Sequence, residues 1–275
     1  MPELPEVETA RALIAETALE RRIVDVDDSD TFVCRPHAPG ELRDALVGRM
    51  LTAAHRQGKS IWCETSGTVP AAGPGPVLGI HLGMSGRIIV VTASGQVAEG
   101  GDPPPRSSRP AGLGWIRFML RFADGGSLAL SDRRRLGRVR LDPDIDLLGP
   151  DAGQITREEF RSMISKGTIG VKARLLDQSK ISGIGNLLAD EVLWQAKIFP
   201  AASVSSLRRA PVDRLYQAVT SVVASAVSGG GAHTGDMIGF RHAGARCPRC
   251  GAEMRHGIVG GRSTWWCSRE QRARG

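Results

Sequence analysis

The second and third residues, Pro2 and Glu3, are the pair in this chain best suited to covalent chemistry. Removal of Met1, which is routine when a small residue follows, leaves Pro2 with a secondary α-amine that is partly unprotonated at neutral pH. Such an amine attacks an aldehyde-level carbon to give an iminium directly, and the Glu3 carboxyl can shuttle the proton. A second interpretation stays open, because proline and acidic residues are also favoured in the first turn of an ordinary helix.

Three cysteines near the C-terminus have the spacing of a metal site. Cys247 and Cys250 form one close pair, and Cys267 follows after sixteen residues, with Glu270 where a second pair would end. Two close thiol pairs are typical of a tetrahedral zinc site, so we expect zinc here. Three outcomes are open: Glu270 completes the ligand set, His256 substitutes for it, or the module folds with little or no metal.

Charge and composition point to a polyanionic partner. The 275 residues carry a net charge of +7 and a pI near 9.6, with five arginines between positions 133 and 140. Nucleic acid is the usual partner of such a chain, although a simply soluble basic protein is the alternative. No apolar run is long enough to span a membrane, and the first twenty residues do not read as a signal peptide. We therefore expect a monomeric cytoplasmic protein, associated with the nucleoid if bacterial.

The hydrophobic pattern predicts an α+β protein of more than one domain. A helix is expected over residues 6–20, followed to about residue 142 by short β-prone runs that indicate a sandwich or barrel. Helices are expected after a capping box at Thr156–Glu159 and over 172–178, 186–196 and 213–227. Loops are expected at 100–114 and, as a mobile segment, at 228–244.

A glycine-rich turn precedes the helix expected at 186–196. Gly183 and Gly185 flank Ile184, and Asn186 follows them as a potential helix N-cap or phosphate donor. Two glycines before a helix let backbone N–H groups approach an anion. Alone, this turn is equally consistent with a plain helix start.

Together, the N-terminal string Pro2–Glu8, the glycine turn and the cysteine module resemble the formamidopyrimidine-DNA glycosylase/endonuclease VIII family over nearly the whole chain. The resemblance implies a bifunctional base excision repair enzyme that removes oxidised bases from duplex DNA and then cleaves the abasic site. It implies an N-terminal catalytic β-sandwich domain at 1–145, a helix–two-turn–helix domain at 146–240 and a zinc-finger-like β-hairpin module at 241–275.

The resemblance also implies roles for single residues on the strands and turns that carry them. Pro2 forms the Schiff base and Glu3 is the acid, Lys59 assists elimination, and Arg262 contacts the phosphate for the second strand cleavage. The DNA-binding residues that it implies are Met84, Arg134, Leu136, Lys172 and Asn186. Met84, Arg134 and Leu136 fill the gap left by the flipped base, while segment 229–239 lies over that base.

Several positions depart from the family pattern. Leu136 replaces an aromatic wedge, Arg133 replaces a proline, and Trp115 lies near a position where many members have a DNA-contacting histidine. Leu4 resembles the branch that acts on oxidised purines. Other functions stay open: an endonuclease VIII-like enzyme for oxidised pyrimidines, a non-catalytic reader of damaged DNA, or an RNA-binding zinc ribbon.

Overall fold

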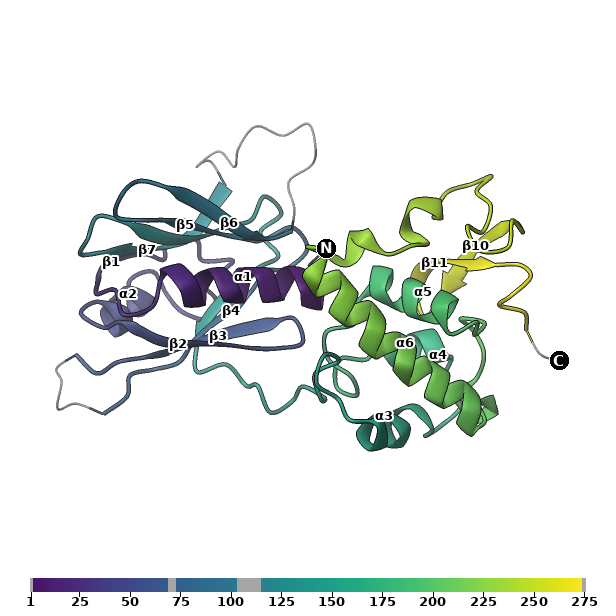
Figure 1. Ribbon diagram of the computed structural model, residues 1–275. Coiled ribbons are helices and arrows are strands. Elements are labelled where there is room, and N and C mark those ends of the chain that lie inside the picture. Colours follow the sequence, from purple (N-terminus) through teal and green to yellow (C-terminus); the bar gives the residue numbers. More distant parts are fainter. Residues whose placement is uncertain (1, 69–72, 103–114, 274–275) are drawn as a thin grey trace. The chain divides into compact units, whose positions relative to one another are not determined.

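The computed structural model describes residues 2–68, 73–102 and 115–273, which form two compact units. The first unit comprises Met1–Pro2 and Glu6–Ile145, and the second comprises Glu3–Pro5 and Asp146–Gly275. Figure 1 labels most helices and strands of both units.

The first unit is built from two antiparallel sheets (Figure 1). One sheet has the order β1 (Ile23–Asp27), β7 (Ile116–Phe122), β8 (Ser127–Ser131), β5 (Arg87–Val91) and β6 (Val97–Gly101). The other has the order β2 (Leu51–Gln57), β3 (Ser60–Thr65), β4 (Leu78–His81) and β9 (Arg138–Leu141). The helices are α1 (Leu4–Thr17), which continues into this unit from the second, and α2 (Glu41–Leu46). The expected α+β class with an N-terminal helix and a β-sandwich is confirmed.

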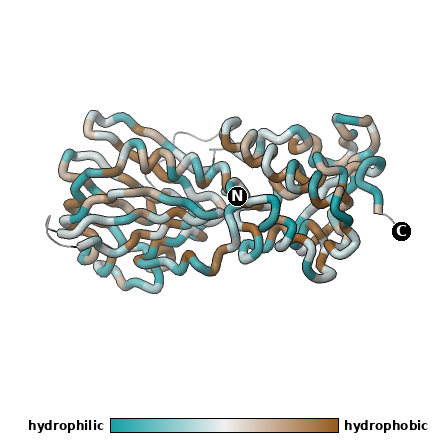
Figure 2. Tube along the Cα trace, turned by 60° about the horizontal axis from the view of Figure 1, so that its bottom comes forward, coloured by the Kyte–Doolittle hydropathy of each residue, from teal (hydrophilic) through white to brown (hydrophobic). Residues whose placement is uncertain are grey.

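Alternation along the strands explains how the sandwich is filled. In β7, Phe118, Leu120 and Phe122 are buried while Arg121 between them is exposed, which is the pattern of a strand with one face in a core. Figure 2 shows this mixture of hydrophobic and hydrophilic positions along the chain. Helix α1 adds apolar side chains to the same core, and a Cβ on Gly100 would lie 2.8 Å from the Cα of Ala10. Strand β6 therefore packs directly against the helix backbone.

The second unit is helical and ends in a hairpin. Its helices are α3 (Arg157–Ile164), α4 (Val171–Leu176), α5 (Asn186–Gln195) and α6 (Arg209–Ser228), with short 3-10 helices η2 (Val204–Ser206), η3 (Ala232–Thr234) and η4 (Ile238–Phe240). Strands β10 (Met254–Val259) and β11 (Arg262–Cys267) pair in antiparallel register. In the described part of the chain, no helix combines the length and apolarity that crossing a membrane requires.

The capping box expected at Thr156 is confirmed, because its side chain accepts from the Glu159 backbone N–H and Glu159 returns a bond to the Thr156 backbone. Segment 228–244 differs from expectation. It is not an open mobile loop but holds η3 and η4, because Ala232 and Met237 are buried in two apolar clusters of the unit. Of the loop expected at 100–114, Gly100 and Gly101 belong to β6, and residues 103–114 lie outside the described residues.

Candidate active site and nucleic-acid interface

The carboxylate of Glu3 caps helix α5. One oxygen, Oε2, accepts from the backbone N–H groups of Gly185 and Leu188 at 3.0 Å each, and Oε1 accepts from Leu187 at 2.8 Å. The residue is 1% exposed. The first turn of a helix has N–H groups without intrahelical partners and a positive dipole end, so it stabilises a negative charge. The proposed acid is thus held rigidly by backbone groups.

This contact explains the glycine turn that the sequence revealed. A Cβ on Gly185 would lie 2.3 Å from the Glu3 Cδ atom, so any side chain there would displace the carboxylate. The helix N-terminus therefore binds an anion, as the motif indicates, but the anion described is the chain's own Glu3. Asn186 is the first residue of α5 and not its N-cap, and its amide donates to the Ser263 carbonyl at 3.0 Å.

A buried ionic cluster joins α4, α5 and β11. The Lys172 ammonium donates to an Asp190 carboxylate oxygen at 2.6 Å, to the Thr264 hydroxyl at 2.7 Å and to the Ser263 carbonyl at 3.2 Å. Arg241 pairs with the other Asp190 oxygen at 2.9 Å. Burial lowers the pKa of Lys172 and raises that of Asp190, because low-polarity surroundings disfavour either charge alone. Their mutual attraction opposes both shifts, because each charge favours the ionised form of the other.

In this structure the Lys172 side chain is fully buried and its ammonium is occupied by Asp190, so its predicted contact with DNA stays a prediction. Lys172 fixes the start of β11. The turn before that strand is Gly260–Gly261, with φ of 59° and 71°, a backbone that glycine adopts most easily. Arg262 follows the turn and is exposed, so the cluster holds the strand that begins with this arginine at a defined place.

In the first unit, Lys59 lies beside the loop that carries Met84. Ser60 pairs with His81 across β3 and β4, and the Gly83 N–H donates to the Nδ1 of His81 at 3.0 Å. Because Nδ1 accepts, the imidazole is neutral there. Burial lowers the pKa of His81 to about 4, and the nearby positive charge of Lys59 adds to the shift.

One buried carboxylate joins the turn that carries Arg134 and Leu136 to Ser85, the residue after Met84. Asp132, which is 0% exposed, accepts from the Arg134 N–H at 3.0 Å, from the Leu136 N–H at 2.7 Å and from the Ser85 hydroxyl at 2.9 Å. The loop bearing Met84 packs tightly on this turn, because a Cβ on Gly83 would lie 2.4 Å from the Leu136 carbonyl carbon. The sequence indicated Met84, Arg134 and Leu136 but not the acid that joins them.

The candidate metal ligands Cys247, Cys250, Cys267 and Glu270 come together. One donor atom from each lies within 4.8 Å of the others. Two of their negative charges would be balanced by Zn²⁺, and the other two by Lys197 and Arg249, which pair with the Glu270 oxygens at 3.0 and 3.1 Å. Glu270 Oε2, the oxygen that faces Arg249, is buried and accepts no well-aligned hydrogen bond from the described part of the chain. The donor set therefore fits a metal ion.

His256 does not join this cluster. It lies on β10 with Nε2 2.9 Å from the Ser263 hydroxyl, and its ring packs on Trp265. The Trp194 indole N–H donates to the Cys247 sulfur at 3.3 Å, which favours a thiolate. Of the two fourth ligands that the sequence left open, the structure places Glu270 at the cysteines.

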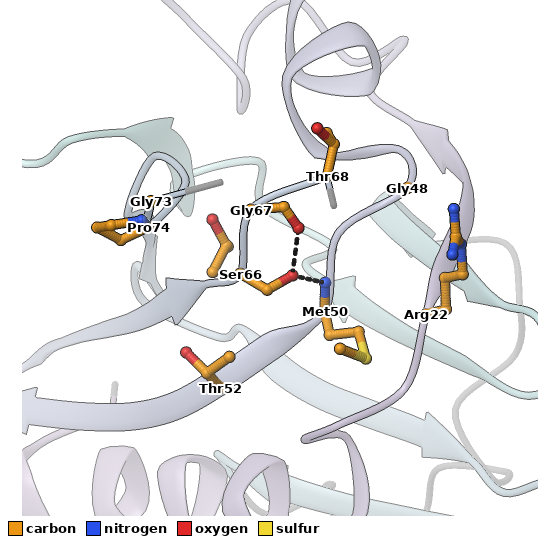
Figure 3. A pocket seen from close by; sticks show the side chains of 10 residues that line it. Arg22, Gly48, Met50, Thr52, Ser66, Gly67, Thr68, Gly73 and Pro74 are labelled. Carbon is orange, nitrogen blue, oxygen red and sulfur yellow. Dashed lines mark hydrogen bonds between the residues drawn. The ribbon is translucent and has the colours of Figure 1, made fainter. Parts of the chain in front are cut away.

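The remaining predicted residue, Pro2, is buried directly before α1. A cavity of about 470 Å³ lies elsewhere in the first unit, beside the start of β2 and the end of β3 (Figure 3). Its lining includes Met50, Thr52 and Ser66, and Arg22 is its one charged group among the described residues. The described lining contains no carboxylate, histidine or lysine.

Two family models match the chain. Residues 1–139 match the formamidopyrimidine-DNA glycosylase N-terminal domain, and residues 148–237 match the formamidopyrimidine-DNA glycosylase H2TH domain. A formamidopyrimidine-DNA glycosylase of Alkalilimnicola ehrlichii is 32% identical and covers 99% of this chain and 100% of its own length. One from Arabidopsis thaliana is 34% identical over 82% of this chain and 58% of its own length.

Solved structures of Lactococcus lactis Fpg are similar throughout. One holds DNA containing FAPY-dG, with a TM-score of 0.79 and 26% identity over 98% of this chain and 100% of that chain. Another holds DNA containing an oxidised pyrimidine, with a TM-score of 0.80 and 27% identity over 99% of this chain and 100% of that chain.

We predict that Lys172→Met lowers the free energy of unfolding by about 3–5 kcal/mol, because it leaves a buried Asp190 charge with one partner fewer. Urea unfolding of the variant and the parent measures the difference. Lys166→Met, which removes an exposed lysine, is the control. If the free energy of unfolding fell by less than about 1 kcal/mol, the cluster would contribute no more than a weak surface ion pair, and the prediction would be wrong.

We predict a pH-dependent difference between the parent protein and His81→Gln. The pKa of His81 is about 4 in the folded state and near 6.5 when unfolded. The stability that depends on a neutral His81 is therefore fully present above pH 6.5. This stability is lost as the pH falls from about 6.5 to 4, and the total loss in the free energy of unfolding approaches about 3 kcal/mol. Unfolding free energies measured across this window should fall further in the parent than in the variant. His233→Gln, at an exposed position, should follow the parent; parallel curves for parent and His81→Gln would contradict the assignment.

Proposed function

Because this chain belongs to the formamidopyrimidine-DNA glycosylase family, we propose that it excises oxidised bases from duplex DNA and cleaves the resulting abasic site through Pro2. The observation that carries the proposal is the capping of α5 by Glu3. A buried carboxylate that is fixed by three backbone donors, in the residue after a proline amine, supplies an oriented acid for amine catalysis.

In the proposed reaction, removal of Met1 frees the Pro2 nitrogen, which attacks C1′ of the damaged nucleotide. The bond between C1′ and the base breaks, and the base leaves with its electron pair and a proton. The Glu3 carboxylate accepts the proton that the Pro2 nitrogen loses after its attack, and it delivers this proton to the sugar ring oxygen as the ring opens to the iminium. The iminium then acidifies the hydrogen on C2′. A proton acceptor removes this hydrogen, and the 3′ phosphate departs. A further elimination expels the 5′ phosphate, and water releases Pro2.

Other residues hold the substrate in this scheme. Lys59 assists the eliminations from the hairpin between β2 and β3, and Arg262 binds the departing phosphate from its exposed position after the glycine turn. Asn186 binds the phosphate beside the lesion. Lys172, whose side chain is buried, positions β11, the strand that begins at Arg262.

The base gap is filled by Met84, Arg134 and Leu136. A flipped base leaves an empty place in the stack, and an apolar side chain on a firm backbone is suited to occupying it. The Asp132 hydrogen bonds supply that firmness for the turn that carries Arg134 and Leu136. Arg134 is exposed and bonds the base that has lost its partner.

We propose oxidised purines as the preferred lesions and three functional domains at 1–145, 146–240 and 241–275. The FAPY-dG complex of the Lactococcus relative supports the first choice, while its oxidised pyrimidine complex keeps an endonuclease VIII-like preference as the alternative. Leu4 is 1% exposed in the core of the second unit, so its influence on lesion choice would be indirect.

Borohydride trapping tests this function, because reduction of an iminium leaves a permanent protein–DNA bond. We expect an untagged protein to form a covalent adduct with duplexes that carry FAPY-dG or an abasic site, and less with an oxidised pyrimidine. An N-terminal extension that keeps Pro2 internal should abolish the adduct, since its nitrogen is then an amide.

The matched control carries the same extension at the C-terminus and should be trapped like the untagged protein. Binding without any adduct on every duplex would support the non-catalytic reader of damage. Trapping by the N-terminally extended protein would overturn the assignment of Pro2.

We further propose that zinc occupies the cluster of Cys247, Cys250, Cys267 and Glu270, where it would stabilise the C-terminal hairpin without entering the reaction. We expect close to one zinc per purified chain by elemental analysis, and a strong loss in Cys267→Ser. Glu270→Gln should weaken zinc retention against a chelator, whereas Glu253→Gln, an exposed acid of the same module, should not. Equal retention in both glutamine variants would mean that Glu270 serves only Lys197 and Arg249.

A further inference from the structure

Two exposed aromatic side chains lie among arginines in the first unit. Phe32 is 41% exposed and Trp115 is 45% exposed, and no other aromatic residue stands among the large exposed hydrophobics of the described chain. Together with four arginines they form what we call the aromatic–arginine patch. Its members are Phe32, Arg35, Trp115, Arg133, Arg135 and Arg138.

The arginines of the patch lie over the rings. The guanidinium carbon of Arg35 is 4.1 Å from the centre of the Phe32 ring, and that of Arg138 is 5.1 Å from it. Arg133 is 5.7 Å from the Trp115 ring centre. These are cation–π distances, which keep each ring and its cations in a fixed relation.

One carboxylate links the two halves of the patch. Asp30 accepts two hydrogen bonds from Arg135, at 2.8 and 2.9 Å, and its Oδ1 accepts from the Phe32 N–H at 3.1 Å. The same residue lies 3.7 Å from Arg117, whose guanidinium stands 5.7 Å from the Trp115 ring centre. The patch is therefore a single ordered surface and not two isolated side chains.

The patch also keeps unneutralised positive charge. Arg135 is paired with Asp30, but no carboxylate of the described residues forms an ion pair with Arg35, Arg133 or Arg138. Arginines that are held in place without acids present their donors to phosphate oxygens. Exposed rings beside such charges are the combination used to bind single-stranded nucleic acid, where bases stack on the rings.

We propose that the aromatic–arginine patch binds unpaired nucleotides of DNA, so that single-stranded and locally unpaired DNA are ligands of this protein in addition to the closed duplex. Bases inside a closed duplex are stacked on each other and offer no free face to Phe32 or Trp115, whereas unpaired bases do. The inference rests on the proposed function for its choice of DNA. It extends that function, because the patch shares the turn of Arg134 but uses different side chains.

The test compares binding of three unmodified labelled DNAs by fluorescence anisotropy: a thymidine single strand, a closed duplex, and the same duplex with a central unpaired bubble. In the double variant Phe32→Leu/Trp115→Leu, which keeps apolar bulk but removes both rings, we expect affinity for the single strand and the bubble to fall roughly tenfold per lost stacking contact. Affinity for the closed duplex should stay within about twofold.

Two matched variants complete the test. Val97→Ala removes an exposed apolar side chain of the same unit outside the patch and should bind all three DNAs like the parent. Trp115→Phe keeps a ring and should keep most of the affinity for the single strand. In the parent, we expect the single strand to quench tryptophan fluorescence, and Trp115→Phe should lose the part of this quenching that comes from Trp115. If the double variant does not fold, this fluorescence measurement tests the proposal by itself.

Equal losses on closed duplex and single strand would overturn the proposal, because the patch would then be a general electrostatic surface. Unchanged binding in the folded double variant, or unchanged quenching in Trp115→Phe, would also overturn it. These assays use intact DNA and no chemistry, so they are independent of borohydride trapping. Ring-dependent binding without a covalent adduct would leave this inference standing while the proposed catalysis failed.

Discussion

The hydrogen bonds between the Glu3 carboxylate and the first turn of α5 are the constraint on which the candidate site depends. They join residues that are 182 or more positions apart in the chain, and they satisfy N–H groups that would otherwise lack partners. The absence of a side chain at Gly185 is what allows the carboxylate to reach them. The proposed acid is therefore held in place by backbone donors, and Pro2 precedes it directly in the chain.

A second constraint is the burial of opposite charges around Asp190. Removing Lys172 and Asp190 from water costs free energy that their attraction offsets only if every remaining donor and acceptor is satisfied. Thr264, the Ser263 carbonyl and Arg241 meet that condition. Such a cluster contributes less to net stability than to a unique arrangement, because a shifted hairpin would leave charges unpaired. The position of the exposed Arg262 depends on this arrangement, because Lys172 bonds the two residues that follow it.

The first unit uses the same principle in its turns. Asp132 and Asp30 are buried or nearly so, and each accepts backbone N–H groups as well as side-chain donors. A carboxylate that gathers several N–H donors fixes a turn without help from a sheet. The exposed side chains on these turns, which we propose as nucleic-acid contacts, are therefore carried by a backbone that is fixed at several points.

The sequence by itself predicted the class of fold from local pattern, the family through resemblance and the cysteine cluster from close spacing, and all three are confirmed. The reactivity of the N-terminal pair Pro2 and Glu3 stays a prediction. The sequence identified Met84, Arg134 and Leu136 as a group only through resemblance. Only the tertiary structure decided that Lys172 is buried, that Glu270 and not His256 approaches the cysteines, and that Glu3 is the anion at α5. Those outcomes depend on which distant groups desolvate and pair with one another, and no local pattern in the chain encodes that choice.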